Sequence, residues 1–172
     1  MIRKILAAGL MAGLPLGQGA AAEGGDSVSL QVVGCAARCP SFEIQVFDNG
    51  RMTFKSNNEF TAAKGTEHRN GMRSIYTRIS QYLQDSGALT APVDCAPGNS
   101  DPSVATVQAV SAGQTRTASW SSGCANQKDK GKSIVKVFVN QTGMWRLIHS
   151  DTRWWEKYWE DPQMTGRSDV AQ

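Results

Sequence analysis

Residues 41–56 have the sequence SFEIQVFDNGRMTFKS, which carries the clearest structural pattern of the chain. Every second residue in its first half is apolar, which predicts a strand over residues 41–47 with one buried face. Asp-Asn-Gly at 48–50 follows, and Asn and Gly tolerate the positive φ angles that a tight hairpin turn requires. The chain then returns as a strand over residues 51–56. The stretch therefore predicts an antiparallel hairpin, and with it a sheet at the centre of the fold.

Further strands are predicted on both sides of this hairpin. Residues 27–33 alternate between apolar and polar side chains, which predicts an N-terminal strand. Residues 104–110 and 114–120 flank Ala-Gly at 112–113, and this pattern predicts a second hairpin. A weaker apolar pattern predicts a short strand near Phe60.

The spacing of the apolar residues changes after residue 70, and the new spacing predicts a helix over residues 71–85. Apolar residues recur there at spacings of three and four, which places them on one helix face. Asn70 is expected to cap the start of this helix, and Gly87 lies where a left-handed residue commonly ends one. The apolar face consists of Met72, Ile75, Tyr76, Ile79, Tyr82 and Leu83.

Residues 130–149 fit either a helix or a strand. The spacing of Ile134 and Phe138 suits a helix, whereas the β-branched run around them is typical of a strand. Gly143 weakens any continuous helix through this segment. The period favours a C-terminal helix here, and residues 154–159 could add one further turn.

These elements predict an α+β fold in a single domain, residues 27–162. Its antiparallel sheet consists of two hairpins and the N-terminal strand, packed by the amphipathic helix and the C-terminal helix, with two disulfides. A chain of this length is expected to form one domain with a substantial core. Residues 163–172 are polar, and we expect a loose tail.

The N-terminus has the organisation of a cleavable bacterial signal peptide, residues 1–22. Arg3 and Lys4 precede an uncharged apolar run, and small alanines close the segment. That run is shorter than the roughly 20 residues of a membrane span, so no transmembrane anchor is expected in the mature chain. A linker, residues 23–26, leads into the domain, and the expected localisation is periplasmic or extracellular. A frayed helix of a cytosolic protein is the alternative.

The charge of the chain argues against a nucleic-acid partner. There are 18 Lys and Arg residues against 15 Asp and Glu residues, and Arg3 and Lys4 belong to the signal peptide. The mature chain is therefore almost neutral. It has no electrostatic attraction toward nucleic acid or anionic lipid.

The four cysteines, Cys35, Cys39, Cys95 and Cys124, all lie beyond the signal peptide. An even number in an oxidising compartment predicts two disulfides, and three pairings are possible. We favour Cys35–Cys39 and Cys95–Cys124, because the second pair brackets the predicted second hairpin. Free thiols, a four-cysteine metal site and a redox pair are the alternatives, although metal knuckles and redox pairs usually have two intervening residues.

Residue types that carry catalysis are sparse. Of the two histidines, His68 precedes the predicted helix and His149 stands two residues before Asp151. A histidine beside a carboxylate can act as a general base, so an envelope hydrolase that uses His149 or His68 is the alternative function. Gly-Lys-Ser at 131–133 resembles the end of a phosphate loop without its earlier glycine, and no cofactor is expected.

Aromatic residues gather near the C-terminus, where four of the five tryptophans lie between residues 145 and 159. Tryptophan and arginine dominate binding hot spots, so this cluster predicts a recognition surface for a protein or a glycan. The alternative is that the rings pack the last helix against the sheet. The candidate binding residues are Arg153, Trp154, Trp155 and Trp159.

The order of the motifs carries a family resemblance. A Cys-x-x-x-Cys-Pro loop, an alternating strand, an Asp-x-Gly turn and a returning strand precede an amphipathic helix, a hairpin, a Gly-Cys pair and a Trp-containing segment. The matching residues are Cys35, Cys39, Pro40, Phe42, Asp48, Gly50, Gly123 and Cys124. Residues 27–155 thus resemble a bacterial family called domain of unknown function 6438. The resemblance implies a helix within 130–149, where this chain has more valine and less charge, and it supplies no catalytic residue.

Two classes of function follow from these observations. The first is a non-catalytic envelope module that binds a protein or glycan partner, as an inhibitor, immunity factor or accessory subunit does. The second is the envelope hydrolase. The scarcity of catalytic residue types favours the binding module.

Overall fold

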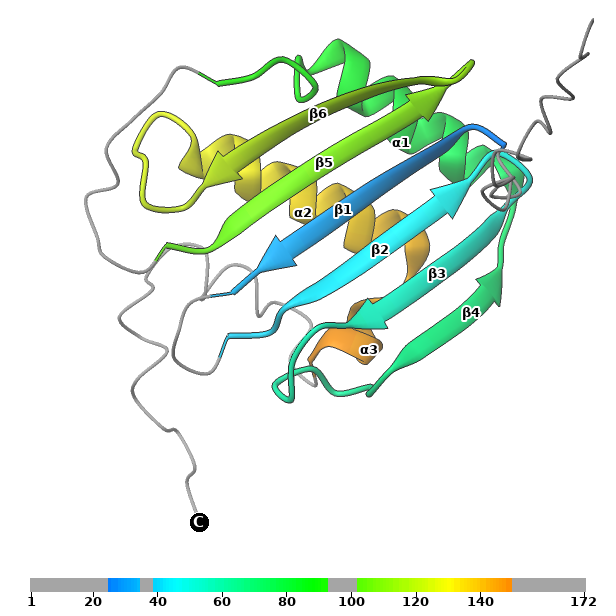
Figure 1. Cartoon of the computed structure of the whole chain (residues 1–172), viewed down its shortest axis with the longest axis horizontal. Helices are drawn as coiled ribbons and strands as arrows, with labels where there is room; N and C mark the ends of the chain where they lie inside the picture. The colour runs from blue at the N-terminus through cyan, green and yellow to red at the C-terminus, as the bar shows by residue number, and fades with distance from the viewer. Residues whose placement is uncertain (1–24, 35–38, 93–101, 150–172) are drawn as a thin grey trace, which may run out of the picture.

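The computed structural model describes residues 25–34, 39–92 and 102–149. These form an α+β fold around one six-stranded antiparallel sheet, with the strand order β4-β3-β2-β1-β5-β6 (Figure 1). The strands are β1 (Ser27–Val33), β2 (Phe42–Phe47), β3 (Arg51–Ser56), β4 (Thr66–Asn70), β5 (Val104–Ser111) and β6 (Gln114–Ser121). The helices are α1 (Arg73–Asp85), α2 (Lys128–Thr142) and α3 (Trp145–Ile148). The predicted α+β class is confirmed.

Both long helices lie behind the sheet in Figure 1 and leave its near face uncovered by any described helix. Helix α1 contacts β1 and β2, helix α2 contacts β5 and β6, and the two helices contact each other. The core lies between these two layers. It includes Phe42 and Phe54, whose rings stack at 6.0 Å on neighbouring strands, and Phe138 of α2, which is fully buried.

The two predicted hairpins are confirmed. In the first, Val46 lies opposite Met52, and Gly50 has the positive φ angle of 89° that the turn requires. The second hairpin pairs β5 with β6 from Val104–Ser121 to Ser111–Gln114. The N-terminal strand is not an edge strand, because β1 lies between β2 and β5 and pairs with both.

The predicted amphipathic helix is confirmed as α1. It buries Ile75, Ile79 and Leu83, and Gly87 follows its end with a left-handed φ angle of 68°. The predicted cap was wrong. The N-cap residue is Met72 and has no side-chain cap hydrogen bond, while Asn70 is the last residue of β4.

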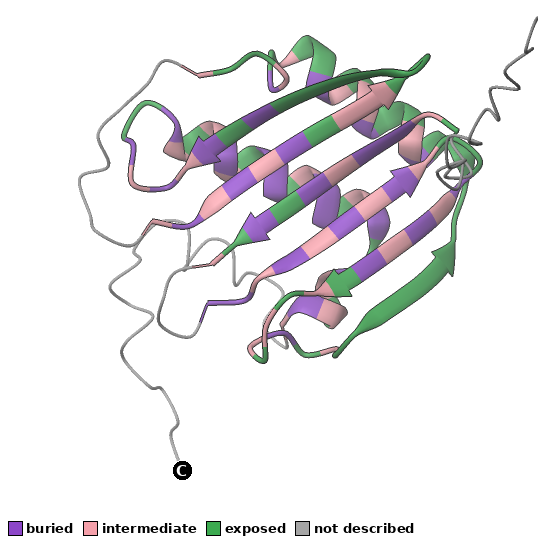
Figure 2. Ribbon diagram, in the orientation of Figure 1, coloured by how far each residue is buried: buried purple, intermediate pink, exposed green. Residues whose placement is uncertain are grey.

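The strand predicted near Phe60 was wrong, because residues 57–65 form a turn-rich loop and the additional strand, β4, begins at Thr66. Side-chain hydrogen bonds fix this loop. Asn58 accepts from the Ser41 N–H and donates to the Cys39 carbonyl. Strand β4 has the sequence TEHRN and is exposed at every residue, as Figure 2 shows. It therefore lacks the alternation of apolar residues by which an inner strand is predicted.

Residues 130–149 are helical, as the period favoured, but they do not form one helix. Helix α2 ends at Gly143, whose φ angle of 65° lies in the left-handed region, and α3 begins two residues later. The β-branched residues are part of this helix, and Ile134, Val135 and Val139 are buried on the side of α2 that faces the core. The further turn predicted over residues 154–159 lies outside the described residues.

Candidate functional site

The uncovered face of the sheet is lined by two polar rows that run across all six strands. Cross-strand pairing aligns one side chain from each strand in a row. The first polar row is Thr66, Lys55, Glu43, Gln31, Thr106 and Ser119. The second polar row is His68, Thr53, Gln45, Ser29, Gln108 and Thr117. Every member carries a hydrogen-bonding group, so the centre of this face is polar throughout.

A hollow of about 170 Å³ opens on this face where the two polar rows cross the middle strands. Its lining residues are Ser29, Gln31, Glu43, Thr106, Gln108 and Thr117. Three of these side chains are short and three are long. Ser29 lies on the central strand between Gln45 and Gln108, so the small side chain leaves a depression among longer neighbours.

The groups around the hollow are hydroxyls, amides and one carboxylate. Among the described lining residues, Glu43 is the only one with an ionisable side chain. Lys55 lies directly opposite Glu43 on the neighbouring strand, outside the lining. Between β5 and β6 the hydroxyls of Thr106 and Ser119 are 2.9 Å apart and share a hydrogen bond. The hollow is thus suited to a ligand that both donates and accepts hydrogen bonds.

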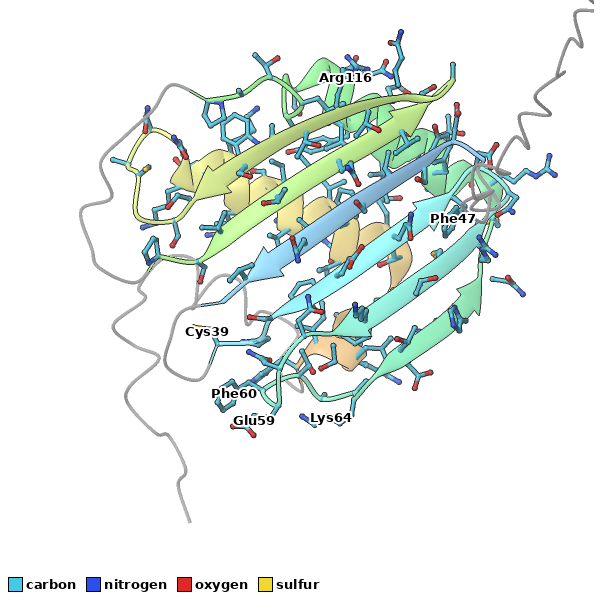
Figure 3. The ribbon with its side chains drawn as sticks, in the orientation of Figure 1. Cys39, Phe47, Glu59, Phe60, Lys64 and Arg116 are labelled. Atoms are coloured by element: carbon cyan, nitrogen blue, oxygen red, sulfur yellow. The ribbon has the colours of Figure 1, made fainter. Side chains whose placement is uncertain are left out.

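An aromatic ring, that of Phe47, lies beside the polar rows at one end of β2. Phe47 ends β2, and the Arg51 guanidinium lies 4.2 Å from the centre of its ring. Figure 3 places Phe47 at the opposite end of the sheet from Cys39 and the loop with Phe60 and Lys64. In this loop the Lys64 ammonium donates to the carbonyls of Glu59 and Thr61, so Lys64 fixes the loop backbone.

A second hollow, of about 350 Å³, lies where α1 ends near the edge strand β6. Its lining residues are Leu83, Gln84, Gly87, Leu89, Thr90 and Arg116. Only three of them have polar side chains, and Arg116 is the only charged one. The hollow on the uncovered face has a polar side chain at each of its described lining positions and is therefore the better candidate for specific recognition.

The predicted disulfide residues are described in part. Cys39 and Cys124 are 2% and 3% exposed, and both are disulfide-bonded. Cys35 and Cys95 lie outside the described residues. Gly34, the last described residue before Cys35, approaches Cys39 so closely that a Cβ at position 34 would meet the Cys39 Cβ at 2.5 Å.

The predicted binding residues Arg153, Trp154, Trp155 and Trp159 all lie outside the described residues. Of the aromatic cluster the structure describes Trp145, which begins α3 and packs against the core. The Arg146 guanidinium lies 4.7 Å from the centre of the Trp145 ring. This tryptophan therefore contributes to packing, as the alternative interpretation expects.

The two histidines lie on different elements. His68 lies in β4, and its Nδ1 is 3.3 Å from the Thr53 hydroxyl. His149 follows α3, and its backbone N–H donates to the Trp145 carbonyl. Asp151, the carboxylate two residues after His149, lies outside the described residues.

Lys130 has a different role from the one its sequence context predicts. The run Lys-Asp-Lys at 128–130 resembles a solvated helix face. The Lys130 ammonium instead donates to the Ser86 carbonyl at 2.6 Å. It thereby supplies a cation at the C-terminus of α1, whose last turn has no basic residue.

Sequence reasoning missed the two polar rows as a site. In the sequence their residues are the polar members of each strand's alternating pattern. A strand face that is only exposed to solvent has the same pattern. What brings Gln31 beside Glu43 on one side and Thr106 on the other is the pairing of β1 with both β2 and β5.

Within the described ranges, no group of His, Cys, Asp and Glu side chains is arranged to hold a metal ion. Nor does that part of the chain contain a helix with the length and apolar character of a membrane span.

A comparison with curated proteins finds no significant relative. A comparison with protein families matches residues 26–140 to the domain of unknown function DUF6438. The match begins just before β1 and extends into α2, so it includes the whole sheet and every described residue that lines the hollow on its uncovered face. The resemblance of the motif order is thereby confirmed, and the chain belongs to the family of the domain of unknown function DUF6438.

Proposed function

We propose that this protein is a non-catalytic binding module of the bacterial cell envelope, and that it recognises a glycan on the uncovered face of its sheet. The observation that carries the proposal is the hollow of about 170 Å³, whose described lining residues all have polar side chains. Sugars present many hydroxyls that both donate and accept. The serine and threonine hydroxyls and glutamine amides of the hollow offer matching groups.

The charge of the hollow favours recognition over glycoside hydrolysis. Hydrolysis of glycosidic bonds typically requires a pair of carboxylates, and Glu43 supplies the one carboxylate among the lining residues that the structure describes. His68 belongs to the second polar row, and its Nδ1 lies within hydrogen-bond distance of the Thr53 hydroxyl, not of a carboxylate. The hydrolase alternative therefore has less support than the binding module.

Export to the periplasm or the exterior is part of the proposal. It is supported by the signal-peptide pattern of residues 1–22 and by the disulfide-bonded state of Cys39 and Cys124, since disulfides persist mainly in oxidising compartments. We further propose that the C-terminal residues Arg153, Trp154, Trp155 and Trp159 add stacking contacts to the bound partner.

The proposed pairing is Cys35–Cys39 and Cys95–Cys124. The close approach of Gly34 to Cys39 supports the first bond. For the second, the chain on either side of Cys95 is fixed near the end of β6: the Trp120 ring N–H donates to the Ala88 carbonyl, and the Ser103 N–H donates to the Ser122 hydroxyl. Peptide mapping without reduction should recover these two links, and a Cys35–Cys124 link would overturn the pairing.

The glycan proposal is tested by NMR titration of the mature protein with soluble N-acetylglucosamine oligomers and with cellulose-derived oligomers. Amide shifts are expected on β1, β2 and β5, around the hollow. The Ser29→Gln variant should fold normally, because Ser29 faces solvent, but should lose at least about tenfold in affinity, since the longer side chain fills the hollow.

The matched control is Lys136→Ala, which changes an exposed residue of α2 and should bind like the original protein. Two results would refute the glycan proposal. The first is that neither these oligomers nor glucosamine oligomers shift any resonance. The second is that the shifts fall on the helical side and survive in the Ser29→Gln variant.

A further inference from the structure

Glu43 gives the hollow a negative charge, which is not required for the recognition of a neutral sugar. It is half-buried on β2 and forms one wall of the hollow, beside the Gln31 amide of β1. None of the described residues that line the hollow is basic. An anionic group partly removed from water favours a cationic partner, because charge-assisted hydrogen bonds are about twice as strong as neutral ones.

We propose that the Glu43 carboxylate is a subsite for a positively charged amino group, so that the preferred glycan carries free amines, as an oligomer of glucosamine does. This inference rests on the proposed function and specifies its ligand. An ammonium group donates three hydrogen bonds and accepts none. The hollow can receive them through the carboxylate of Glu43, the amide oxygen of Gln31 and the hydroxyl oxygens of Ser29 and Thr106.

Within the protein, the Lys55 ammonium can compete with a ligand amine for the Glu43 carboxylate. It lies directly opposite Glu43 on β3 and is exposed, so its flexible ammonium can approach the carboxylate from outside the hollow. An exposed pair of this kind is weak and costs little to separate. A ligand amine held inside the hollow would therefore compete with Lys55, and removal of the lysine charge should strengthen the binding of amine-bearing ligands.

The test compares glucosamine oligomers with N-acetylglucosamine oligomers of the same length, by calorimetric titration below the pKa of the amine. The mature protein should bind the amine form roughly five- to tenfold more tightly, and added salt should reduce this preference. Glu43→Gln, which keeps the shape and loses the charge, should abolish the preference while it retains binding of the acetylated form. Lys55→Gln should raise affinity for the amine form alone.

The outcomes separate the inference from the proposed function. Equal affinity for the two oligomers, or a preference that survives in Glu43→Gln, overturns the amine subsite while glycan binding stands. If neither oligomer binds, the inference is overturned. If cellulose-derived oligomers also fail to bind, the glycan function itself is overturned. Because Glu43 and Lys55 both lie on the solvent face, thermal unfolding should be nearly unchanged in both variants.

Discussion

Asp26 shows at the scale of one residue how the ends of the sheet are fixed. Its two carboxylate oxygens accept hydrogen bonds from the Ser111 hydroxyl at 2.8 Å and the Ala112 N–H at 3.0 Å. Ala112 is the only described non-glycine residue with a positive φ angle, 49°. The Asp26 carbonyl also accepts from the Asp48 N–H at 2.9 Å. One residue thus connects the turns of both hairpins.

These bonds make the contribution of Asp26 depend on pH. The hydrogen bonds from Ala112 and Ser111 lower the pKa of Asp26 below its ordinary value of 3.8. Because the pKa is lower in the folded state, the charged form stabilises the fold above about pH 4, and this contribution is lost as the pH falls through the lowered pKa. We expect Asp26→Asn to be slightly less stable than the original protein at neutral pH, with a difference that shrinks in acid.

Urea unfolding at a series of pH values from neutral to about pH 2 measures this difference. Asp85→Asn, at the end of α1 and exposed, is a control that removes the same charge far from the hairpin turns. A constant difference between Asp26→Asn and the original protein across the whole range would contradict the assignment.

At the level of secondary-structure elements, a helix end and a hairpin turn each require a glycine, for different reasons. Gly143 ends α2 with a φ angle of 65°, and a Cβ there would meet no atom within 4 Å. Gly50, in the first hairpin, combines a φ angle of 89° with a Cβ position that would collide with the Gly71 carbonyl oxygen. Gly143→Ala should therefore cost only backbone strain, roughly 1–2 kcal/mol, whereas Gly50→Ala should cost roughly 2–5 kcal/mol.

The free energies of unfolding of the two variants, measured side by side, check this order. Gly143→Asn is a useful third variant, because asparagine tolerates the left-handed region and should be milder than alanine. Equal losses for Gly50→Ala and Gly143→Ala would mean that the approach of Gly71 to the turn contributes nothing.

Local sequence patterns predict some of these elements and not others. The first hairpin and α1 follow from alternation, from a glycine turn and from helical spacing, because each buries one apolar face. Strand β4 has no buried face at all, so it carries no such pattern, and its place is set by pairing with β3. The residues after Gly143 show the same limit: the glycine predicts a break but not that α3 resumes at Trp145.

For the whole molecule, the candidate site depends on strand order, which no local pattern encodes. Glu43 and Thr106 are far apart in sequence and lie on the two strands that flank β1. From the sequence each is only a polar residue in an alternating strand. The hollow exists because an antiparallel sheet stacks these polar positions into rows once the non-local β1–β5 pairing forms.

The central position of β1 also implies a constraint on folding order. The first strand of the domain pairs with β5 at Ser27–Val110, across most of the domain's length, so a chain that emerges N-terminus first exposes one edge of β1 until β5 arrives. Contacts of such long sequence separation form slowly. A fragment that ends at Pro92 should therefore aggregate, and a separate peptide of residues 102–123 should restore its solubility by pairing with the open edge. The topology thus delays completion of the sheet until β5 (Val104–Ser111) has been synthesised, so the preceding strands exist for a time with an open hydrogen-bonding edge.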